Sequence, residues 1–187
     1  YTSREGGSSD GIIASGFCGA EGDNLEWTLD ENDVLTISGT GAMADYAAAT
    51  GTGAAPWSWY IDVSEIKSLV IKDGVASIGS YAFYGCAGLT SVTIPESVTS
   101  IGDGSFQQCS NLNEIEFCHS ATAALEFGGT VFGQDGAIET TVVVGNIDAV
   151  NPAVRGYDWA GDGRTAAFKA RDEGSASSDI IASGECG

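Results

Sequence analysis

A 23-residue repeat in the middle of the chain is the feature that most constrains its fold. Segment 66–88 aligns without gaps with segment 89–111, and the apolar positions of the first recur in the second. The matched pairs are Ile66 and Leu89, Leu69 and Val92, Ile71 and Ile94, Val75 and Val98, Ile78 and Ile101, Phe83 and Phe106, and Cys86 and Cys109. A period in this range indicates a solenoid, in which each coil buries its apolar face against its neighbours.

Each unit divides into a strand and a return path. The Leu-x-x-Leu-x-Leu spacing points alternate side chains of a short strand inward. Phe83 and Cys86 are three positions apart, as are Phe106 and Cys109, which predicts a single helical turn facing the core. Stacked coils would then place Cys86 above Cys109, and we expect two buried free thiols there and no disulfide. A third unit starts at Leu112, and "ETTVVVG" supplies a closing strand.

The stretch "IPESVTSIGDGSFQQCSNLNEIEF" resembles the BspA-type leucine-rich repeat of bacterial cell-surface proteins. The resemblance is specific over 66–117 and weaker to 144. It implies a fold of the α+β repeat-solenoid class, with coils at 66–88, 89–111 and 112–144, each a strand plus a short helical turn. The slot that holds asparagine or cysteine in leucine-rich repeats is occupied here by Gly74 and Ser97. Without an asparagine ladder, the turns must close differently.

The flanking segments are expected to cap the solenoid. Residues 12–65 are predicted to form an N-terminal cap, consisting of a β-hairpin over "LEWTLDENDVLTISGTG", a loop and a short helix from Pro56. The segment also resembles the one that precedes the repeats in many BspA-like proteins. Residues 145–169 are predicted to form an irregular C-terminal cap.

Nearly the same short segment occurs close to the start of the sequence and again at its end. "SDGIIASGFCG" near the start recurs as "SDIIASGECG" at 178–187, and Ile12, Ile13 and Cys18 match Ile180, Ile181 and Cys186 at a separation of 168 positions. Similar Gly/Ser-rich segments precede both copies. We therefore expect 1–11 to be a linker, and 170–187 to be a linker followed by the start of the next module in a tandem array.

Charge and apolar patterning exclude several classes of function. The formal net charge is −19, so nucleic acid and anionic membrane surfaces are disfavoured as partners. No apolar run approaches the roughly 18 residues of a membrane span, and no signal peptide is expected either. The five cysteines are too sparse to suggest a disulfide framework or a zinc site.

The sequence also argues against catalysis. Gly39, Gly41 and Ala44 match a dinucleotide-binding fingerprint formally, with Asp62 near the acidic position, but no helix or βαβ pattern follows them. Cys118 and His119, if adjacent on a strand, point to opposite faces and make a poor dyad. Asp158 and Asp162 fit turn chemistry better than a calcium loop. We therefore expect no enzymatic activity, no cofactor and no metal.

The resemblance implies a non-enzymatic, extracellular or surface-displayed binding module of an adhesin-like protein, with an unidentified host protein as partner. Such a ligand would meet the exposed strand face, here Ser68, Val70, Lys72, Ser91, Thr93, Glu114 and Glu116. A structural spacer without a ligand is the main alternative. A glycan-binding domain is a further one: Trp57 is expected to be buried in the cap, whereas Trp59 and Tyr60 are left as candidates for sugar stacking.

Overall fold

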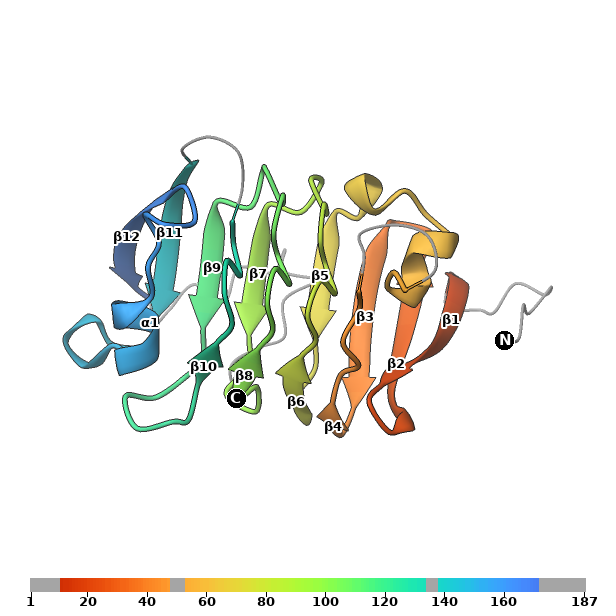
Figure 1. Cartoon of the computed structure of the whole chain (residues 1–187), viewed down its shortest axis with the longest axis horizontal. Coiled ribbons are helices and arrows are strands. Elements are labelled where there is room, and N and C mark those ends of the chain that lie inside the picture. The colour runs from red at the N-terminus through yellow and green to blue at the C-terminus, as the bar shows by residue number, and fades with distance from the viewer. Residues whose placement is uncertain (1–10, 48–52, 134–137, 172–187) are drawn as a thin grey trace.

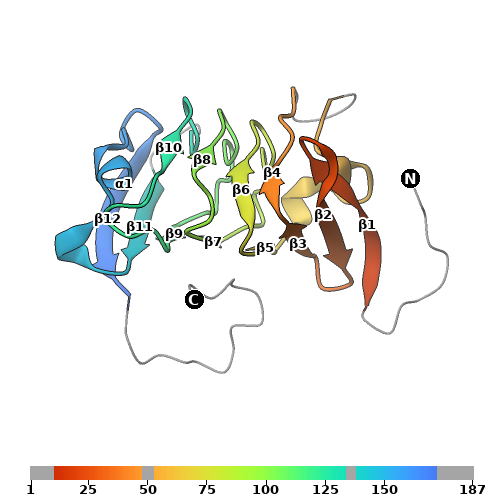
Figure 2. The ribbon, with the colours of Figure 1, turned by 90° about the horizontal axis from the view of Figure 1, so that it is seen from below.

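The coils stack along one axis, so that strands far apart in the sequence form one long layer (Figure 1). The computed structural model describes residues 11–47, 53–133 and 138–171. Turned by 90°, the molecule shows a second layer of shorter strands facing the long one (Figure 2). The predicted class, a short leucine-rich-repeat solenoid, is confirmed, and the described residues contain few helices.

The long layer consists of two hydrogen-bonded sheets that lie end to end. Their orders are β1-β2-β3-β5 and β7-β9-β11-β12, and β5 lies beside β7 in Figure 1. The strands are β1 (Ile12–Gly19), β2 (Gly22–Asp30), β3 (Val34–Gly39), β5 (Ser68–Ile71), β7 (Ser91–Ile94), β9 (Glu114–Phe117), β11 (Ile138–Val144) and β12 (Arg164–Ala170). The short layer has the order β10-β8-β6-β4, with β4 (Gly41–Ala42), β6 (Val75–Ile78), β8 (Ser100–Ile101) and β10 (Glu126–Phe127).

The pairing register confirms the repeat read from the sequence. Strands β7 and β9 are parallel, with Val92 opposite Ile115, and β6 and β8 are parallel, with Ile78 opposite Ile101. Both pairs are 23 positions apart, so equivalent residues of successive coils stack directly on one another. The inward side chains of these strands are buried, because neighbouring coils cover them on both sides.

The return path of each coil differs from the prediction in one respect: it is not helical. Alternate amides point to the next coil, and the N–H groups of Tyr81, Phe83 and Gly85 donate to the carbonyls of Asp103, Ser105 and Gln107. The following coil repeats this pattern against residues 129–133. A helical turn would direct its N–H groups along its own axis, whereas the stacked coils offer each amide a carbonyl next door.

A column of stacked rings runs through the core from cap to cap. Trp57, Phe83, Phe106, Phe132 and Trp159 follow one another with ring centroids 5.2–5.5 Å apart and planes inclined by 13–28°. Four of the five rings are essentially inaccessible to solvent, and Trp159 at the C-terminal end is also buried. The repeat therefore sets the positions of three rings, and each cap supplies a tryptophan that ends the column.

Ser97 takes over the bridging role that asparagine has elsewhere. Its Oγ accepts a hydrogen bond from the N–H of Gly74, 3.2 Å away, and donates one to the carbonyl of Val75, 3.0 Å away. Gly74 has a φ of 102°, and a Cβ there would lie 2.5 Å from the carbonyl oxygen of Gly39. One hydroxyl thus joins two coils at a corner where only glycine fits.

The N-terminal cap contains the predicted hairpin and two strands more. Strands β2 and β3 are antiparallel, with Trp27 opposite Ile37, and β3 then pairs in parallel with β5. The first unexpected strand is β1, which pairs antiparallel with β2 and forms the edge of the layer. The second is the two-residue β4, which pairs in parallel with β6 in the short layer. The predicted short helix from Pro56 is the 3-10 turn η1 (Pro56–Trp59), followed by η2 (Val63–Glu65).

The C-terminal cap is less irregular than predicted, because it adds β12 to the sheet. Between β11 and β12 the chain forms η3 (Ile147–Ala149) and the short helix α1 (Pro152–Gly156). The buried Arg164 guanidinium donates hydrogen bonds to the carbonyls of Phe132, Leu112 and Cys109 and to the hydroxyl of Thr140. A cation from the cap therefore satisfies backbone acceptors of the last two coils.

Candidate binding surfaces

The outer face of the long layer carries most of the residues predicted to contact a ligand. Pairing arranges its outward side chains in rows across the strands: Ser91, Glu114, Thr141 and Ala167 form one row, and Thr93, Glu116, Val143 and Lys169 form another. Of the predicted residues, Lys72, Ser91 and Glu114 are exposed, and Ser68 and Glu116 are half-buried. The structure therefore brings these five side chains to one face, as expected.

Val70 and Thr93 depart from the prediction of an exposed strand face. Their side chains are on the outer face, but only 5% of Val70 and 8% of Thr93 is exposed. The Thr93 hydroxyl donates to Oε2 of Glu116, 3.0 Å away, and Oε1 of Glu116 forms an ion pair with Arg171. These contacts occupy part of the face, so a ligand there would meet chiefly Ser91 and Glu114.

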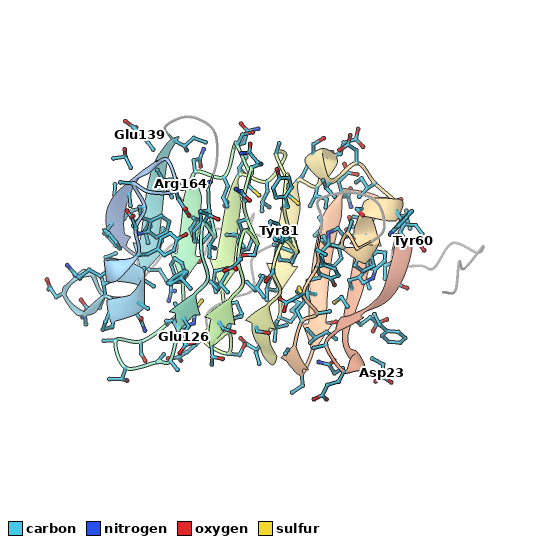
Figure 3. The ribbon with its side chains drawn as sticks, viewed as in Figure 1. Asp23, Tyr60, Tyr81, Glu126, Glu139 and Arg164 are labelled. Carbon is cyan, nitrogen blue, oxygen red and sulfur yellow. The ribbon has the colours of Figure 1, made fainter. Side chains whose placement is uncertain are left out.

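All the large hydrophobic side chains that are exposed among the described residues lie in the N-terminal cap. These are Ile12, Ile13, Phe17, Trp59 and Tyr60, with Phe17 61% and Trp59 64% exposed. As predicted, Trp57 is buried. The Tyr60 ring lies 5.5 Å from that of Trp27, at the end of the molecule opposite Arg164 (Figure 3). Sequence reasoning identified Trp59 and Tyr60 but not Phe17, because β1 was not predicted.

A shallow depression at the C-terminal cap has no counterpart among the sequence predictions. It measures about 680 Å³ and is lined by Phe127, Thr130, Tyr157 and Asp158, among others. The Phe127 and Tyr157 rings are 4.6 Å apart. Phe127 and Tyr157 are distant in the sequence, and no local motif joins them, so only the stacked coils could show that they meet.

The two acidic side chains of the "YDWAGDG" loop accept hydrogen bonds from neighbouring groups of the fold. Asp158 accepts a hydrogen bond from the N–H of Gly161, 2.9 Å away. The buried Asp162 accepts one from the N–H of Phe132, 2.8 Å away, and another from the Tyr157 hydroxyl. Burial, followed by this hydrogen bond, raises the pKa of Tyr157. Within the part of the chain that the structure describes, no group of three or more acidic, histidine or cysteine side chains is placed to hold a metal ion.

Three cysteines, Cys18, Cys86 and Cys109, and the single histidine are buried. As predicted, Cys86 and Cys109 are buried free thiols. The Cys109 thiol donates to the carbonyl of Phe83, 3.2 Å away. A hydrogen bond with Cys109 and burial raise the pKa of Cys86 well above its usual value. Cys118 is disulfide-bonded. His119 is buried, and its Nε2 contacts the carbonyl of Val98, 2.6 Å away.

None of the helices formed by residues 11–47, 53–133 and 138–171 has the length and apolar character needed to cross a bilayer.

Comparisons with known proteins agree with this architecture. A crystal structure of a leucine-rich repeat protein from Eubacterium ventriosum is similar, with a TM-score of 0.53 and 24% sequence identity. The alignment covers 85% of this chain but 45% of that protein, so the chain spans less than half of its length. No curated protein matches the chain. The model of the BspA type leucine-rich repeat region matches residues 59–153, half of the sequence, and the chain belongs to this family.

Proposed function

We propose that the chain is a non-enzymatic binding module that recognises a protein ligand through the outer face of its long layer. The observation that carries the proposal is the row of exposed side chains from neighbouring coils, Ser91 and Glu114 above all. Among the described residues, no side chain forms a hydrogen bond or an ion pair with these two. Solenoids offer such extended surfaces to their ligands because side chains from successive repeats stand in line. The strongly acidic chain, with a net charge of −19, favours a ligand with a complementary basic patch.

A role in attachment at the bacterial cell surface extends this proposal. Family membership supports it, because BspA-type repeats are typically surface-associated. The recurrence of the β1 sequence at 178–187 supports a tandem arrangement, although that segment and the linker at 1–10 lie outside the described residues. Weak contacts made by each module would then add by multivalency.

Binding of the chain to immobilised extracellular-matrix proteins, mucins and host cells tests the proposal. Glu114→Lys reverses a charge in the middle of the outer face, and Glu126→Lys makes the same change on β10, on the other layer, as Figure 3 shows. Saturable binding that is weakened by Glu114→Lys but not by Glu126→Lys is expected. Equal effects of both changes, or no binding across the panel, would contradict the outer face as the binding site.

A spacer that holds another domain away from the cell is the second candidate. The extended layer and the tryptophans at both ends of the ring column favour it, because they give a rigid rod without requiring a ligand. Absence of binding together with a rigid rod-like shape in solution scattering would select it. Glycan binding is a third candidate, favoured by the exposure of Trp59 and Tyr60. Saturable binding on a glycan array that Trp59→Ala abolishes would select that function.

A further inference from the structure

We propose that copies of this module dock end to end, with the free edge of β12 in one copy pairing in parallel with the free edge of β1 in the next. The inference rests on the tandem arrangement in the proposed function but not on any ligand. Its first support is strand direction. β1 is antiparallel to β2, β2 is antiparallel to β3, and the remaining strands of the layer continue parallel to β3. β1 and β12 therefore run in the same direction.

This shared direction means that a copy displaced along the solenoid axis, without rotation, brings β12 beside β1 in the parallel orientation that the neighbouring strands from β3 to β12 already have. In the described residues no strand covers the outer edge of either one. Uncovered edges present unpaired N–H and C=O groups and are templates for further pairing. The contact is heterologous, with different surfaces on the two partners, so it continues into an open array.

The apolar surface at the two ends is the second support. The exposed Phe17 is on the outer side of β1, while Trp59, the last residue of η1, and Tyr60, which follows it, lie on the inner side. At the opposite end, Ala166 and Phe168 on the inner side of β12 are only partly covered by the core. Pairing of the two edges would remove apolar side chains from water at both ends.

Charge complementarity is the third support. From Gly11 to Glu65 every charged residue is acidic, whereas in 145–171 basic residues outnumber acidic ones, although the whole chain is strongly acidic. Lys169 shares its row with Val143, and the continuation of this row in the next copy passes through Ser15 and Thr28. Glu26 is exposed on the outer face of β2, two residues before Thr28. It would then lie two strand spacings across and two residues along from Lys169, about 12 Å away.

The length of chain between β12 and the second copy of the β1 sequence is also compatible with this docking. If Ile180 opens the next β1, ten Cα steps separate it from Ala170, the last residue of β12. Such a connection reaches about 33–36 Å when extended, whereas the return along a seven-residue strand requires about 23 Å. A linker of this length reaches the docked position and keeps the two ends at a millimolar effective concentration.

Sedimentation velocity of the 187-residue chain up to about 1 mM, at low salt, tests the proposal. The same series is run on a chain ending at Arg171, which retains every described element and removes the segment that resembles β1. The average mass is expected to rise with concentration without stopping at the dimer, in either or both chains. Association in the shortened chain alone would mean that the chain's own second β1 sequence occupies the edge of β12. Monomers throughout, or a closed dimer, would overturn the proposal.

Charge reversal identifies the surfaces. Lys169→Glu and Glu26→Lys are each expected to weaken association about two- to fivefold at low salt, and the double variant is expected to restore it. Lys72→Glu is the matched control, because Lys72 is an exposed lysine in the middle of the layer. An equal effect of Lys72→Glu, or no rescue in the double variant, would overturn the assignment. Glu114→Lys separates the two proposals. Loss of ligand binding in this variant, with association unchanged, would assign Glu114 to the ligand-binding face and not to the end-to-end contact.

Discussion

The ring of Phe83 stacks on the ring of Phe106 with centroids 5.2 Å apart and planes inclined by 28°. The two residues are 23 positions apart in the sequence, so residues separated by one repeat are in direct contact in the core. Phe106 also stacks on Phe132, 5.5 Å away, and is therefore covered on both sides. The stability of the solenoid should depend most strongly on such central rings.

Phe106→Ala is expected to lower the free energy of unfolding by about 3–5 kcal/mol, because it removes a fully buried ring and leaves a cavity between two coils. Urea denaturation followed by circular dichroism measures the change. Phe17→Ala is the control: it removes the same atoms from an exposed position, so a loss below about 1 kcal/mol is expected. Similar losses in the two variants would contradict the role of the column.

Arg164→Leu is expected to destabilise the C-terminal cap by about 3 kcal/mol or more, because the buried carbonyls of Phe132, Leu112 and Cys109 lose their donor. Arg164→Lys should recover only part of this loss, since an ammonium group cannot reproduce the fork of the guanidinium. Thermal unfolding compares the three proteins. Full recovery with lysine would show that charge alone suffices.

Ser97→Ala is expected to cost about 1–2 kcal/mol, because it removes the hydroxyl that joins Gly74 and Val75 to the next coil. Hydrogen exchange of the Gly74 amide gives a local readout, and this amide should exchange faster in the variant. The exposed Ser91 provides the control, and Ser91→Ala should leave both the stability and the Gly74 amide unchanged.

His119 is expected to make stability fall as the pH decreases below about 6.5. Burial lowers the pKa of His119 in the folded protein, so between that pKa and 6.5 the unfolded chain binds more protons. The stabilising contribution is therefore complete above pH 6.5 and is lost as the pH falls through the folded pKa. The free energy of unfolding of His119→Gln should vary less between pH 7 and 5. An unchanged slope would exclude His119 as its source.

The thiols of Cys18, Cys86 and Cys109 are expected to react slowly with a thiol reagent while the protein is folded. Burial, reinforced by the nearby Glu26, raises the pKa of Cys18 to about 12, and Cys86 is also held protonated. Only the thiolate reacts. Titration with a chromogenic disulfide at pH 8, with and without denaturant, checks this. Rapid reaction of the folded protein would contradict the buried positions.

Much of the fold was predictable, because residues at equivalent positions of successive repeats contact one another in the folded protein. The sequence alone predicted the coil pitch, the inward faces and the stacked side chains. The prediction came from the matched positions of Phe83 and Phe106, and of Cys86 and Cys109. Within the candidate site, alternation placed Ser91 and Glu114 correctly on the exposed face. It failed for Val70 and Thr93, because their burial depends on neighbouring side chains rather than on strand direction.

The caps were harder to predict, because the 23-residue period does not extend into them. Strand β1 pairs with β2 across a tight turn in a Gly-rich stretch, and β12 joins the layer after two short helices. The return path also differed from prediction, because a spacing of three between Phe83 and Cys86 fits both a helical turn and a run of tight turns. Amides that find carbonyls on the next coil select the second.

The sequence by itself determined the period, the strand faces and the family of this protein, because each of these depends on which side chains recur and at what spacing. The tertiary structure decided what the two ends look like. Only assembly of the layer could leave β1 and β12 as parallel edges that no other described strand covers, expose Phe17 and Trp59 at one end, and bury Arg164 against the carbonyls at the other. Those features depend on which strands and side chains lie next to each end in the folded protein. A local sequence pattern does not show this.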